Sequence, residues 1–546
     1  MRHALAEFLA ESCLSYRTVE RPSFRRLIQL CNPLAPALLV KEDTIANYMS
    51  NLYRTTKNKL IQKFQEANSK INITCDIWTS PNGISILGIT VHWIDSEWIL
   101  REALISAAQL KGLHTGENIA HNLYQVLSEY QIVEKLFCIT TDNASNNHTM
   151  ARDLSQKIPR FNGTEHLIGC FGHILNLAAK DGLKAFSYND VRTDVHPTDA
   201  MNLINIINDE AVTPPGSIIS RIHKVATHSR LTPNRRSKFE GLVKATMMAA
   251  NPTYNGPDRL LLDTPTRWNS TCDMLARSLK LKRAFNMYVQ DEQKLRGNCS
   301  IDEDEWQTMK NVIELLEPLK MATNLASTTS EISISLALPL FEALSSDLDT
   351  IIGTVDLRAL DPAAIAIKEK IMKYYDTALM KSVYVCAMVL DPRYKLSAFS
   401  TDDRNYHNLI EIFKNTAAEY DHHTIDYQNI NIERTTRSNR MDRTSNLFKK
   451  KKISDLPSEI DSYLREDRED DGLNPLDFWK MKKSKYPSLA AMAKVYLGVP
   501  ASSTPSERAF SVGKRIVEDT RGSLKSHTIN ELMCLHNWQK NGIHLL

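Results

Sequence analysis

The sequence predicts an α/β plus α fold, in which one mixed β-sheet is interrupted by a large all-helical insertion. Three short runs rich in β-branched and aromatic residues follow one another at 71–78, 84–93 and 98–105, with turn residues between them. A helical stretch at 115–130 and an apolar strand at 135–141 come next. Helical patterns then dominate most of the remaining chain.

Local signals predict helices before the sheet and a hairpin at its start. Leu27, Leu30 and Leu34 recur at helical spacing, and the stretch 44–67 alternates apolar and charged residues at a similar period. The Pro-Asn-Gly sequence at 81–83 is a turn signal, so the first two strands are expected to form a hairpin. A helical region is therefore expected to precede the sheet.

Helical patterning resumes after Gly169 and continues, with interruptions, to about residue 427. It is strongest near 272–290, 304–326 and 360–380, which together suggest a helical insertion within the sheet domain. Dense apolar helices return after Pro475. The expected order begins with a helical N-terminal region (1–70), the first part of the core (71–180) and the insertion (181–380). A return to the core (381–425), a charged flexible linker (426–472) and a C-terminal region that completes the core (473–546) follow.

Overall charge is nearly balanced, with 67 basic and 64 acidic side chains, so any binding to nucleic acid must come from local basic patches. The stretch 434–452 carries a net charge of +7 and 455–471 a net charge of −6, a pattern typical of a solvated linker or of a nuclear-targeting segment. A second patch is either a DNA-backbone contact or a solvated helix face. Its basic residues are Arg221, Lys224, Arg230, Arg235, Arg236 and Lys238.

The nine cysteines are scattered and mostly lie in apolar runs, which predicts buried free thiols in a reducing compartment. The N-terminus does not have the pattern of a secretory signal. No apolar run approaches the roughly 18 residues needed to cross a bilayer. An intracellular protein without a membrane partner is expected.

Two aspartates lie where a β-β-β-α-β order of the ribonuclease-H-like kind would bring acids together. Asp76 lies in the first strand and Asp142 follows the fourth, and neighbouring strands are only about 5 Å apart. Paired carboxylates select Mg²⁺ or Mn²⁺, and two such ions can drive in-line attack on a phosphodiester. Alternatively, Asp142 is a helix N-cap and Asp76 belongs to a buried ion pair.

Six short motifs stand in the same order as in a known family. They are 75–80 (CDIWTS), 141–147 (TDNASNN), 170–177 (CFGHILNL), 266–270 (TRWNS), 390–395 (LDPRYK) and 500–511 (PASSTPSERAFS). Over roughly residues 10–542 the chain therefore resembles the hAT superfamily of cut-and-paste DNA transposases and the host proteins derived from them.

The resemblance implies a catalytic site and a function. In that family a helical insertion splits a ribonuclease-H-like domain, and the third metal-binding acid comes from the C-terminal segment. For this chain the resemblance implies the triad Asp76, Asp142 and Glu507, with Mg²⁺ or Mn²⁺ as the bound ion. The implied function is metal-dependent DNA cleavage and strand transfer by a dimerising nuclear protein. The alternatives are a non-catalytic remnant or domesticated protein and, for Glu507, a capping box with Thr504.

Other motif residues carry further expectations. Arg267 and Trp268 match the family's Arg-Trp motif, in which the tryptophan is either a stacking platform for a flipped base or a half-buried anchor. Cys170 and His173 match a Cys-x-x-His motif beside the family's active site, and Arg508 belongs to the C-terminal motif, with the roles of all three open. The family's dimerisation region corresponds to about 475–538, whose apolar helices this chain alone is expected to cover poorly.

The expected partners are DNA and a second copy of the chain. Complete members of the family carry an N-terminal BED zinc finger that recognises transposon ends, with a Cys-x-x-Cys pair. This sequence contains no Cys-x-x-Cys, so no zinc cofactor is expected.

Overall fold

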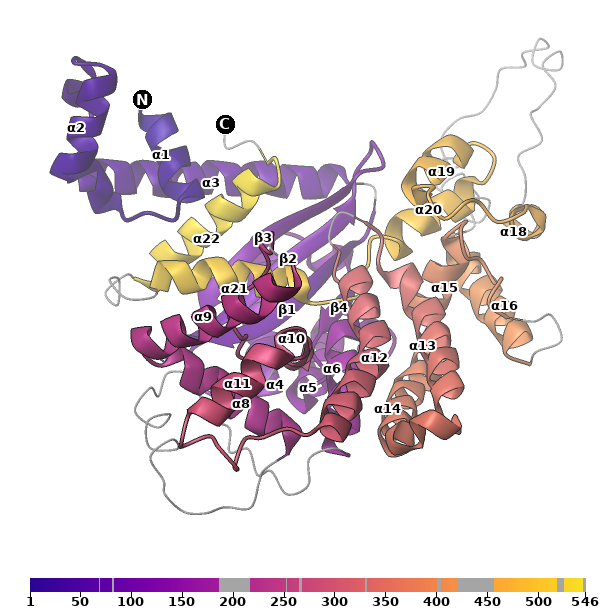
Figure 1. The fold of residues 1–546 in the computed structure, drawn as a ribbon. Coiled ribbons are helices and arrows are strands. Elements are labelled where there is room, and N and C mark those ends of the chain that lie inside the picture. The colour runs from indigo at the N-terminus through magenta and orange to yellow at the C-terminus, as the bar shows by residue number, and fades with distance from the viewer. Residues whose placement is uncertain are drawn as a thin grey trace, which may run out of the picture. The chain divides into compact units, whose positions relative to one another are not determined.

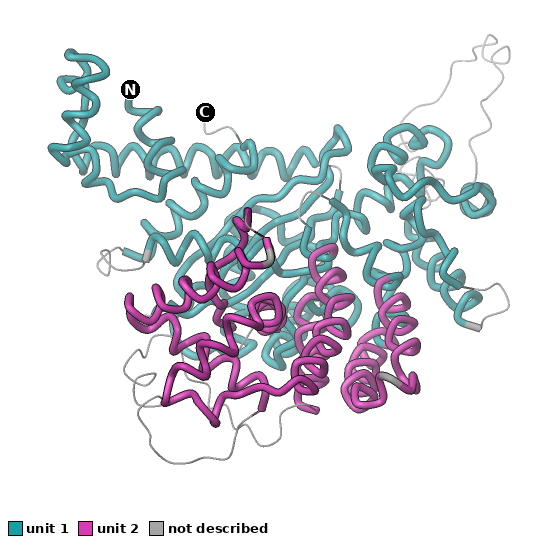
Figure 2. The backbone as a smooth tube through the Cα atoms, in the orientation of Figure 1, with its two compact units in different colours: residues 1–171, 326–339, 377–546 teal, residues 172–325, 340–376 magenta. Residues whose placement is uncertain are grey.

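The computed structural model describes residues 1–67, 69–80, 83–185, 217–251, 253–264, 268–328, 331–399, 404–420, 456–517 and 525–543. The chain forms two compact units (Figure 2). Unit 1 comprises residues 1–171, 326–339 and 377–546, and unit 2 comprises 172–325 and 340–376. Within the described residues, no helix is both long and apolar enough to span a membrane.

A five-stranded mixed sheet forms the centre of unit 1, which confirms the predicted fold class. Its order is β3-β2-β1-β4-β5, and the first three strands, β1 (Ile71–Thr79), β2 (Ser85–Ile94) and β3 (Leu100–Gln109), pair antiparallel. β4 (Leu136–Thr141) and β5 (Leu167–Gly169) continue the sheet in parallel. The sequence patterns predicted the first four strands, but β5 is too short to have produced a signal.

Helices from both ends of the chain cover this sheet (Figure 1). α4 (Gly116–Glu129) packs on α5 (Ser145–Lys157), while α21 (Thr504–Val517) packs on β1 and β2. At the N-terminus, α1 (Arg2–Glu11) and α3 (Glu42–Glu66) pack on each other and on α22 (Ser526–Lys540), whereas α2 (Pro22–Cys31) contributes no buried residue. The predicted helical N-terminal region is therefore present.

The last helix, α22, protects the exposed edge of the sheet. Side chains of Asn530 and Asn537 accept hydrogen bonds from the backbone N–H groups of Ala107 and Leu104 on the edge strand β3, at 2.7 and 2.8 Å. The indole N–H of Trp538 donates to the carbonyl of Leu104 at 2.8 Å. Unpaired edge groups would otherwise invite pairing with another strand, so α22 completes the sheet by side-chain hydrogen bonds.

The C-terminal region is well covered by its own chain, so the prediction that its apolar helices would be left exposed is wrong. Phe478, Trp479, Leu489 and Met492 are buried in the helical cluster, as are the apolar residues of α22. Among the described residues after 456, Met481 is the one large apolar side chain that is strongly exposed. The apolar side chains of these helices are covered because the helices pack against α15, β3 and α1.

A second helical cluster in unit 1 surrounds α15 (Ser382–Leu390), whose residues from Val383 onward are all buried. Its other members are α16 (Arg404–Ala417), α18 (Leu456–Arg465), α19 (Pro475–Lys482) and α20 (Pro487–Tyr496). The presence of α18 corrects the prediction of a flexible linker over 426–472. Residues 456–465 are a helix that packs on α20, whereas the basic run 434–452 lies outside the described residues.

The motif at 390–395 contributes Lys395 to a polar network in this cluster. Lys395, in the left-handed region with a φ of 49°, donates to the carbonyls of Tyr463, Glu466 and Asp467 at the C-terminal end of α18. Cations are favoured there because the last carbonyls of a helix have no partner within it. This lysine therefore ties the return segment to the C-terminal region.

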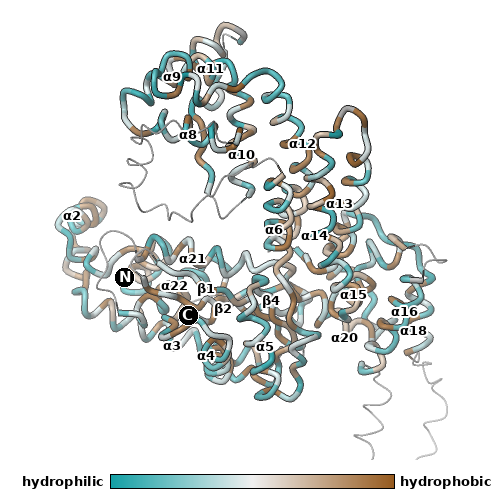
Figure 3. The backbone as a smooth tube through the Cα atoms, turned by 90° about the horizontal axis from the view of Figure 1, so that it is seen from below, coloured by the Kyte–Doolittle hydropathy of each residue, from teal (hydrophilic) through white to brown (hydrophobic). Residues whose placement is uncertain are grey.

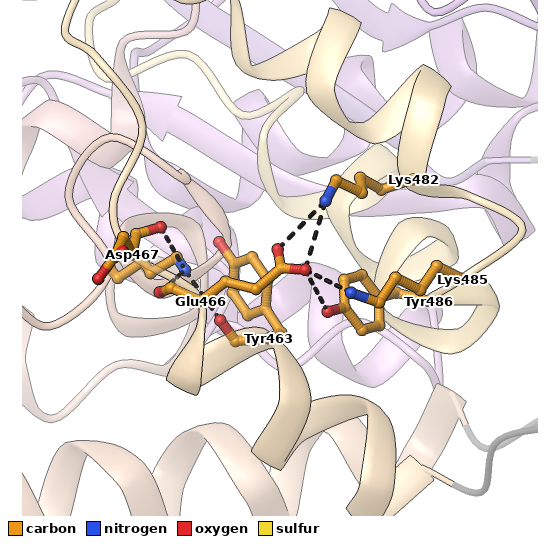
Figure 4. A network of polar contacts seen from close by, with 7 residues as sticks. Tyr463, Glu466, Asp467, Lys482, Lys485 and Tyr486 are labelled. Atoms are coloured by element: carbon orange, nitrogen blue, oxygen red, sulfur yellow. Dashed lines mark hydrogen bonds and ion pairs between the residues drawn. The ribbon is translucent and has the colours of Figure 1, made fainter.

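The carboxylate of Glu466 extends the same network in the other direction (Figure 4). It accepts hydrogen bonds from Lys482 at 3.3 Å, from Lys485 and from the hydroxyl of Tyr486 at 2.9 Å. These interactions lower the pKa of Glu466 in spite of the opposing effect of burial. Residues beyond α18 are thus held against α19 and α20.

Unit 2 consists of helices throughout its described part, as predicted for the insertion. These helices are α6 (Phe171–Lys184), α8 (Ile218–Arg230), α9 (Pro233–Ala250), α10 (Trp268–Lys280), α11 (Lys282–Asp291), α12 (Glu303–Ala326), α13 (Ala337–Ile351) and α14 (Asp361–Leu379). The short segment 326–339 between α12 and α13 belongs to unit 1, which the predicted boundaries did not anticipate.

The protection of the sheet edge yields a test. Asn537→Ala leaves the N–H of Leu104 without its acceptor and is expected to lower the free energy of unfolding by about 1–3 kcal/mol in urea denaturation. His527→Ala, at an exposed position of the same helix, is the matched control and should change it by less than about 0.5 kcal/mol. Equal effects of the two substitutions would contradict the edge-protecting role.

Candidate active site at the acidic end of the sheet

The parallel pairing of β1 with β4 brings two aspartates to the same level. Thr74 pairs with Thr140 in this register, so continuing each strand by two residues places Asp76 level with Asp142. Neighbouring strands lie about 5 Å apart. Both side chains are half-buried, and residue 142 directly follows the last residue of β4.

The pKa of the Cys75 thiol reflects its proximity to both aspartates. Burial raises the pKa of the Cys75 thiol, and the negative charges of Asp76 and Asp142 raise it further. One carboxylate oxygen of Asp76, Oδ1, accepts a hydrogen bond from the backbone N–H of Ile77 at 2.8 Å. The carboxylates of Asp76 and Asp142 therefore place negative charge near Cys75 at the end of β1.

Asp142 is positioned by its own loop rather than acting as the N-cap of α5, where the capping residue is Ala144. Its Oδ1 accepts hydrogen bonds from Asn147 Nδ2 at 2.5 Å and from the Ala144 N–H at 3.2 Å. Asn147 Nδ2 also contacts the Asp142 carbonyl at 3.1 Å. For Oδ2, the described residues provide no hydrogen bond, so this atom is the one available to a ligand.

Two contacts with the sheet hold α21, which carries Glu507, over β1. The hydroxyls of Ser506 and Thr74 lie 2.5 Å apart in the interior. One turn further, the ring of Phe510 stacks on Trp78 with centroids 6.1 Å apart and lies over Gly88, where a Cβ atom would approach the ring to 2.6 Å. Gly88 is the β2 partner of Asp76, so α21 passes over the strand position of that aspartate.

Glu507 lies in the first turn of α21 and is half-buried. The helix begins at Thr504, and the Glu507 N–H donates to the carbonyl of Ser503 at 3.3 Å. Because Ser506 contacts Thr74 of β1 and Phe510 lies over Gly88 of β2, the helix position of Glu507 lies beside the stretch of β1 that carries Asp76. We call these three residues, Asp76, Asp142 and Glu507, the acidic sheet end.

The acidic sheet end fits a divalent cation in the chemistry of its donors. Carboxylate oxygens are hard ligands of the kind that Mg²⁺ and Mn²⁺ prefer. Across the described ranges, however, no three His, Cys, Asp or Glu side chains lie close enough together to hold a metal ion. The three carboxylates share one end of the sheet without forming a closed set of ligands.

Cys170, the cysteine of the Cys-x-x-His motif, links β4 to the segment before α21. Its backbone N–H donates to the carbonyl of Thr141 at 2.6 Å, and its thiol lies 3.3 Å from both the Ser502 hydroxyl and the Ser503 N–H. Cys170 therefore holds the C-terminal segment against the sheet. His173 lies on α6 in unit 2, and Arg508 donates to the carbonyl of Ser327 at 2.8 Å within unit 1.

In unit 2, Trp268 is the first residue of α10, and its side chain is only 3% exposed. Its backbone N–H donates to Oδ1 of Asn176 at 3.3 Å. The neighbouring Arg267 lies outside the described residues. Burial favours a packing role for Trp268 in this structure, and stacking on DNA stays a prediction.

Internal contacts occupy most of the predicted basic patch in unit 2. Arg221 forms an ion pair with Glu305 and donates to the carbonyl of Ser300 at 2.6 Å. Among the other members, Arg230 and Arg236 donate to backbone carbonyls, and Lys238 pairs with Glu292 at 2.8 Å. Lys224 and Arg235 make no such side-chain contact with the described residues. Counting basic residues could not reveal the contacts of Arg221, Arg230 and Lys238, because their partners Glu305, Leu260 and Glu292 lie far away along the chain.

Three family models match the sequence. They describe a ZBED1 RNase-like domain at residues 74–166, a ZBED1 RNase-like helical domain at 199–315 and a hAT family C-terminal dimerisation region at 459–539. The first match contains Asp76 and Asp142, and the last contains Glu507. The matched segments therefore include all three carboxylates of the acidic sheet end.

Similar proteins align over nearly the whole chain. A protein named as transcriptional regulator tpeD of Talaromyces stipitatus is 28% identical over 97% of this chain and 60% of its own length. A protein named as AC transposase of Zea mays is 25% identical over 96% of this chain and 63% of its own length. Human zinc finger BED domain-containing protein 4 is 24% identical over 93% of this chain and 41% of its own length. The chain thus spans about three fifths of the length of the first two.

The positioning of Asp142 can be tested directly. Asn147→Ala removes the amide that donates to its carboxylate, and we expect the free energy of unfolding to fall by about 1–2 kcal/mol. The exposed neighbour His148, replaced by Ala, is the control. Chemical denaturation of both variants measures the difference, and no difference between them would show that the Asn147 contact contributes nothing.

Proposed function

We propose that this chain, a relative of hAT transposases and BED zinc finger proteins, cleaves and joins DNA strands at the acidic sheet end. The matches to an RNase-like domain and to a hAT dimerisation region support this proposal. The family resemblance read from the six motifs is confirmed by these matches. The reaction would be attack of water or a 3′-hydroxyl on a phosphodiester, with Asp76, Asp142 and Glu507 as the catalytic carboxylates.

The observation that carries the proposal is the register of β1 with β4, together with the anchoring of α21. Support comes from the level strand positions of Asp76 and Asp142 and from the contact that holds Ser506, the residue before Glu507, on β1. Asn147 also fixes one carboxylate oxygen of Asp142, while the described residues give the other oxygen no hydrogen bond. A two-metal phosphodiester site needs its carboxylates held in place, and the support of Asp142 by Asn147 would meet part of that need.

In this proposal the chain's own residues bind and orient. Asp76 and Asp142 would hold Mg²⁺ or Mn²⁺, with Glu507 completing the set from α21. When bound, the ions activate the attacking oxygen and stabilise the leaving oxygen. Bringing the three carboxylates together takes side-chain rotation, which their half-exposed positions allow. Ser506 and Phe510 keep Glu507 above β1 while this happens.

A second candidate is a non-catalytic protein that acts through self-association and contacts with DNA or chromatin. The specific observation in its favour is that the described carboxylates do not form a group that could hold a metal. The relative named as a transcriptional regulator fits this alternative. Under either proposal the partners are DNA and a second copy of the chain, and the protein acts in the nucleus.

A plasmid-nicking assay separates the two candidates. The full chain with Mn²⁺ or Mg²⁺ should nick supercoiled DNA, and EDTA should stop the reaction. Asp76→Asn, Asp142→Asn and Glu507→Gln should each reduce the rate by at least about 100-fold, because each removes a charged metal ligand. Glu134→Gln changes an exposed acid just before the opposite end of β4 and should retain the wild-type rate.

The outcomes are distinct. Nicking that persists unchanged in all three variants would contradict the proposed site and indicate a contaminating nuclease. A wild-type chain that binds DNA and self-associates but does not nick it would favour the non-catalytic candidate. Circular dichroism of each variant shows whether the fold is retained.

A further inference from the structure

A chain of buried hydroxyl groups connects the helix that carries Glu507 with the interior of the sheet. Helix α21 lies alongside β1 and β2 (Figure 3). The hydroxyl of Thr74 on β1 lies 2.5 Å from that of Ser506 on α21 and 2.5 Å from that of Thr90 on β2. The Thr90 hydroxyl in turn lies 2.8 Å from Nε2 of His92. We call these four residues the hydroxyl chain: Ser506, Thr74, Thr90 and His92.

The hydroxyl chain is closed off from solvent along its whole length. Ser506, Thr74 and Thr90 are 0% exposed, and His92 is 4% exposed. Thr74 and Thr90 are direct partners in the antiparallel pairing of β1 with β2, so the sheet fixes the centre of the chain. In such surroundings an unpaired hydroxyl is costly, and a fully paired network is rigid. The sheet therefore offers α21 a hydrogen-bond partner at a fixed position.

The number of protons gives the hydroxyl chain one direction. Each hydroxyl has a single proton, and the described residues offer the Ser506 hydroxyl no second acceptor. Ser506 therefore donates to Thr74, which donates to Thr90, which donates to Nε2 of His92. Burial lowers the pKa of His92 to about 3, so the imidazole is neutral near pH 7 and Nε2 is able to accept. The histidine is thus the acceptor on which the order of the other three depends.

The far end of the hydroxyl chain has room for its remaining proton. With Nε2 as the acceptor, the N–H of the neutral ring of His92 is on Nδ1. His92 lines a cavity of about 20 Å³, which is large enough for one water molecule. Ser502 and Pro505, in the segment that leads into α21, line the same cavity. Both ends of the chain therefore lie beside the segment that positions α21.

We propose that the hydroxyl chain is a positioning device for Glu507, with His92 as its distal positioning residue. The inference rests on the proposed function, in which Glu507 is a catalytic carboxylate. Ser506 directly precedes Glu507 in the first turn of α21, so a rotation of the helix that moves one side chain moves the other. A metal site needs its ligands held to within about 0.5 Å. The hydroxyl chain supplies the rotational constraint on α21 that such a site requires.

The apolar contacts of α21 do not supply this constraint by themselves. The ring of Phe510 lies over Gly88 and stacks on Trp78, but apolar contacts have no preferred direction. Hydrogen bonds weaken steeply when their length or angle changes, so the contact of Ser506 with Thr74 resists a rotation that the ring would tolerate. The polar chain therefore adds orientation to a helix whose attachment is otherwise hydrophobic.

Hydrogen–deuterium exchange of the full chain tests whether the hydroxyl chain holds α21. Thr90→Val removes the middle hydroxyl, keeps the shape of the side chain and does not alter α21 itself. The amides of 506–512 should then exchange about 10-fold faster than in the wild type, because the hydroxyl of Thr74 loses its acceptor. Thr90→Ser restores the hydroxyl and should restore slow exchange. The control is Ser106→Ala, which removes a buried hydroxyl of β3 that accepts only a local hydrogen bond, from Ala108.

Plasmid nicking at saturating Mn²⁺ tests whether that constraint serves Glu507. Thr90→Val should lower kcat at least about 10-fold and leave the KM for DNA unchanged, because the carboxylate is misplaced while the DNA-binding surface is intact. His92→Phe, which removes the final acceptor, should act in the same direction. Thr90→Ser and Ser106→Ala should stay within about 2-fold of the wild type. Thermal unfolding of each variant shows how much stability it has lost.

The outcomes separate this inference from the proposed function. If Thr90→Val leaves the exchange of 506–512 unchanged, or if Ser106→Ala raises it equally, the hydroxyl chain does not position α21. A Thr90→Val variant with fast exchange but wild-type nicking would show that the chain only stabilises the fold, and would overturn its positioning role alone. A wild-type chain that does not nick DNA would overturn the proposed function, and the positioning of a catalytic carboxylate with it.

Discussion

The parallel pairing of β1 with β4 is the constraint on which the rest of unit 1 depends. It brings Asp76 level with Asp142, and it also aligns the hydroxyls of Thr74 and Thr140. These two hydroxyls receive the C-terminal segment, since Thr140 donates to the carbonyl of Pro500 at 2.7 Å and Thr74 contacts Ser506. One strand register therefore determines both the position of the two aspartates and the position of the helix that carries the third acid.

The C-terminal region owes its shape to the same sheet and serves two structural purposes. Its first helices surround α15, where the indole of Trp479 donates to the carbonyl of Leu390 at 2.8 Å. Its last helix closes the β3 edge through asparagine side chains. These tasks bury the large apolar side chains of the region, apart from Met481 among its described residues.

Sequence patterns predicted the first four strands and placed Asp76 and Asp142 at their ends, because runs of β-branched and aromatic residues bounded by turn residues are local signals. They were insufficient where long-range pairing decides the outcome. The charge pattern of 455–471 predicts a linker, yet Leu456, Ile460 and Tyr463 lie at helical spacing and are buried. Glu459, also in that run, accepts hydrogen bonds from the backbone N–H groups that begin α20, which charge counting could not reveal.

The same limit applies to the other candidate residues. The basic patch that includes Arg221 is expected to be a DNA-backbone contact or a solvated helix face, and the ion pair of Arg221 with Glu305 joins positions far apart in the chain. Spacing placed Leu27, Leu30 and Leu34 on a helix, yet periodicity alone cannot say whether an apolar stripe faces the core or solvent. Glu507 could be assigned only through the family resemblance, since no local pattern spans the inserted unit.

The most direct test of the account is a crystal structure of the chain soaked in Mn²⁺, with the metal located by its anomalous scattering. The account predicts Mn²⁺ bound at the acidic sheet end, with Asp76, Asp142 and Glu507 rotated toward it and Asn147 still in contact with Asp142. Electron density without metal there, with Glu507 directed away from the two aspartates, would contradict it and favour the non-catalytic candidate.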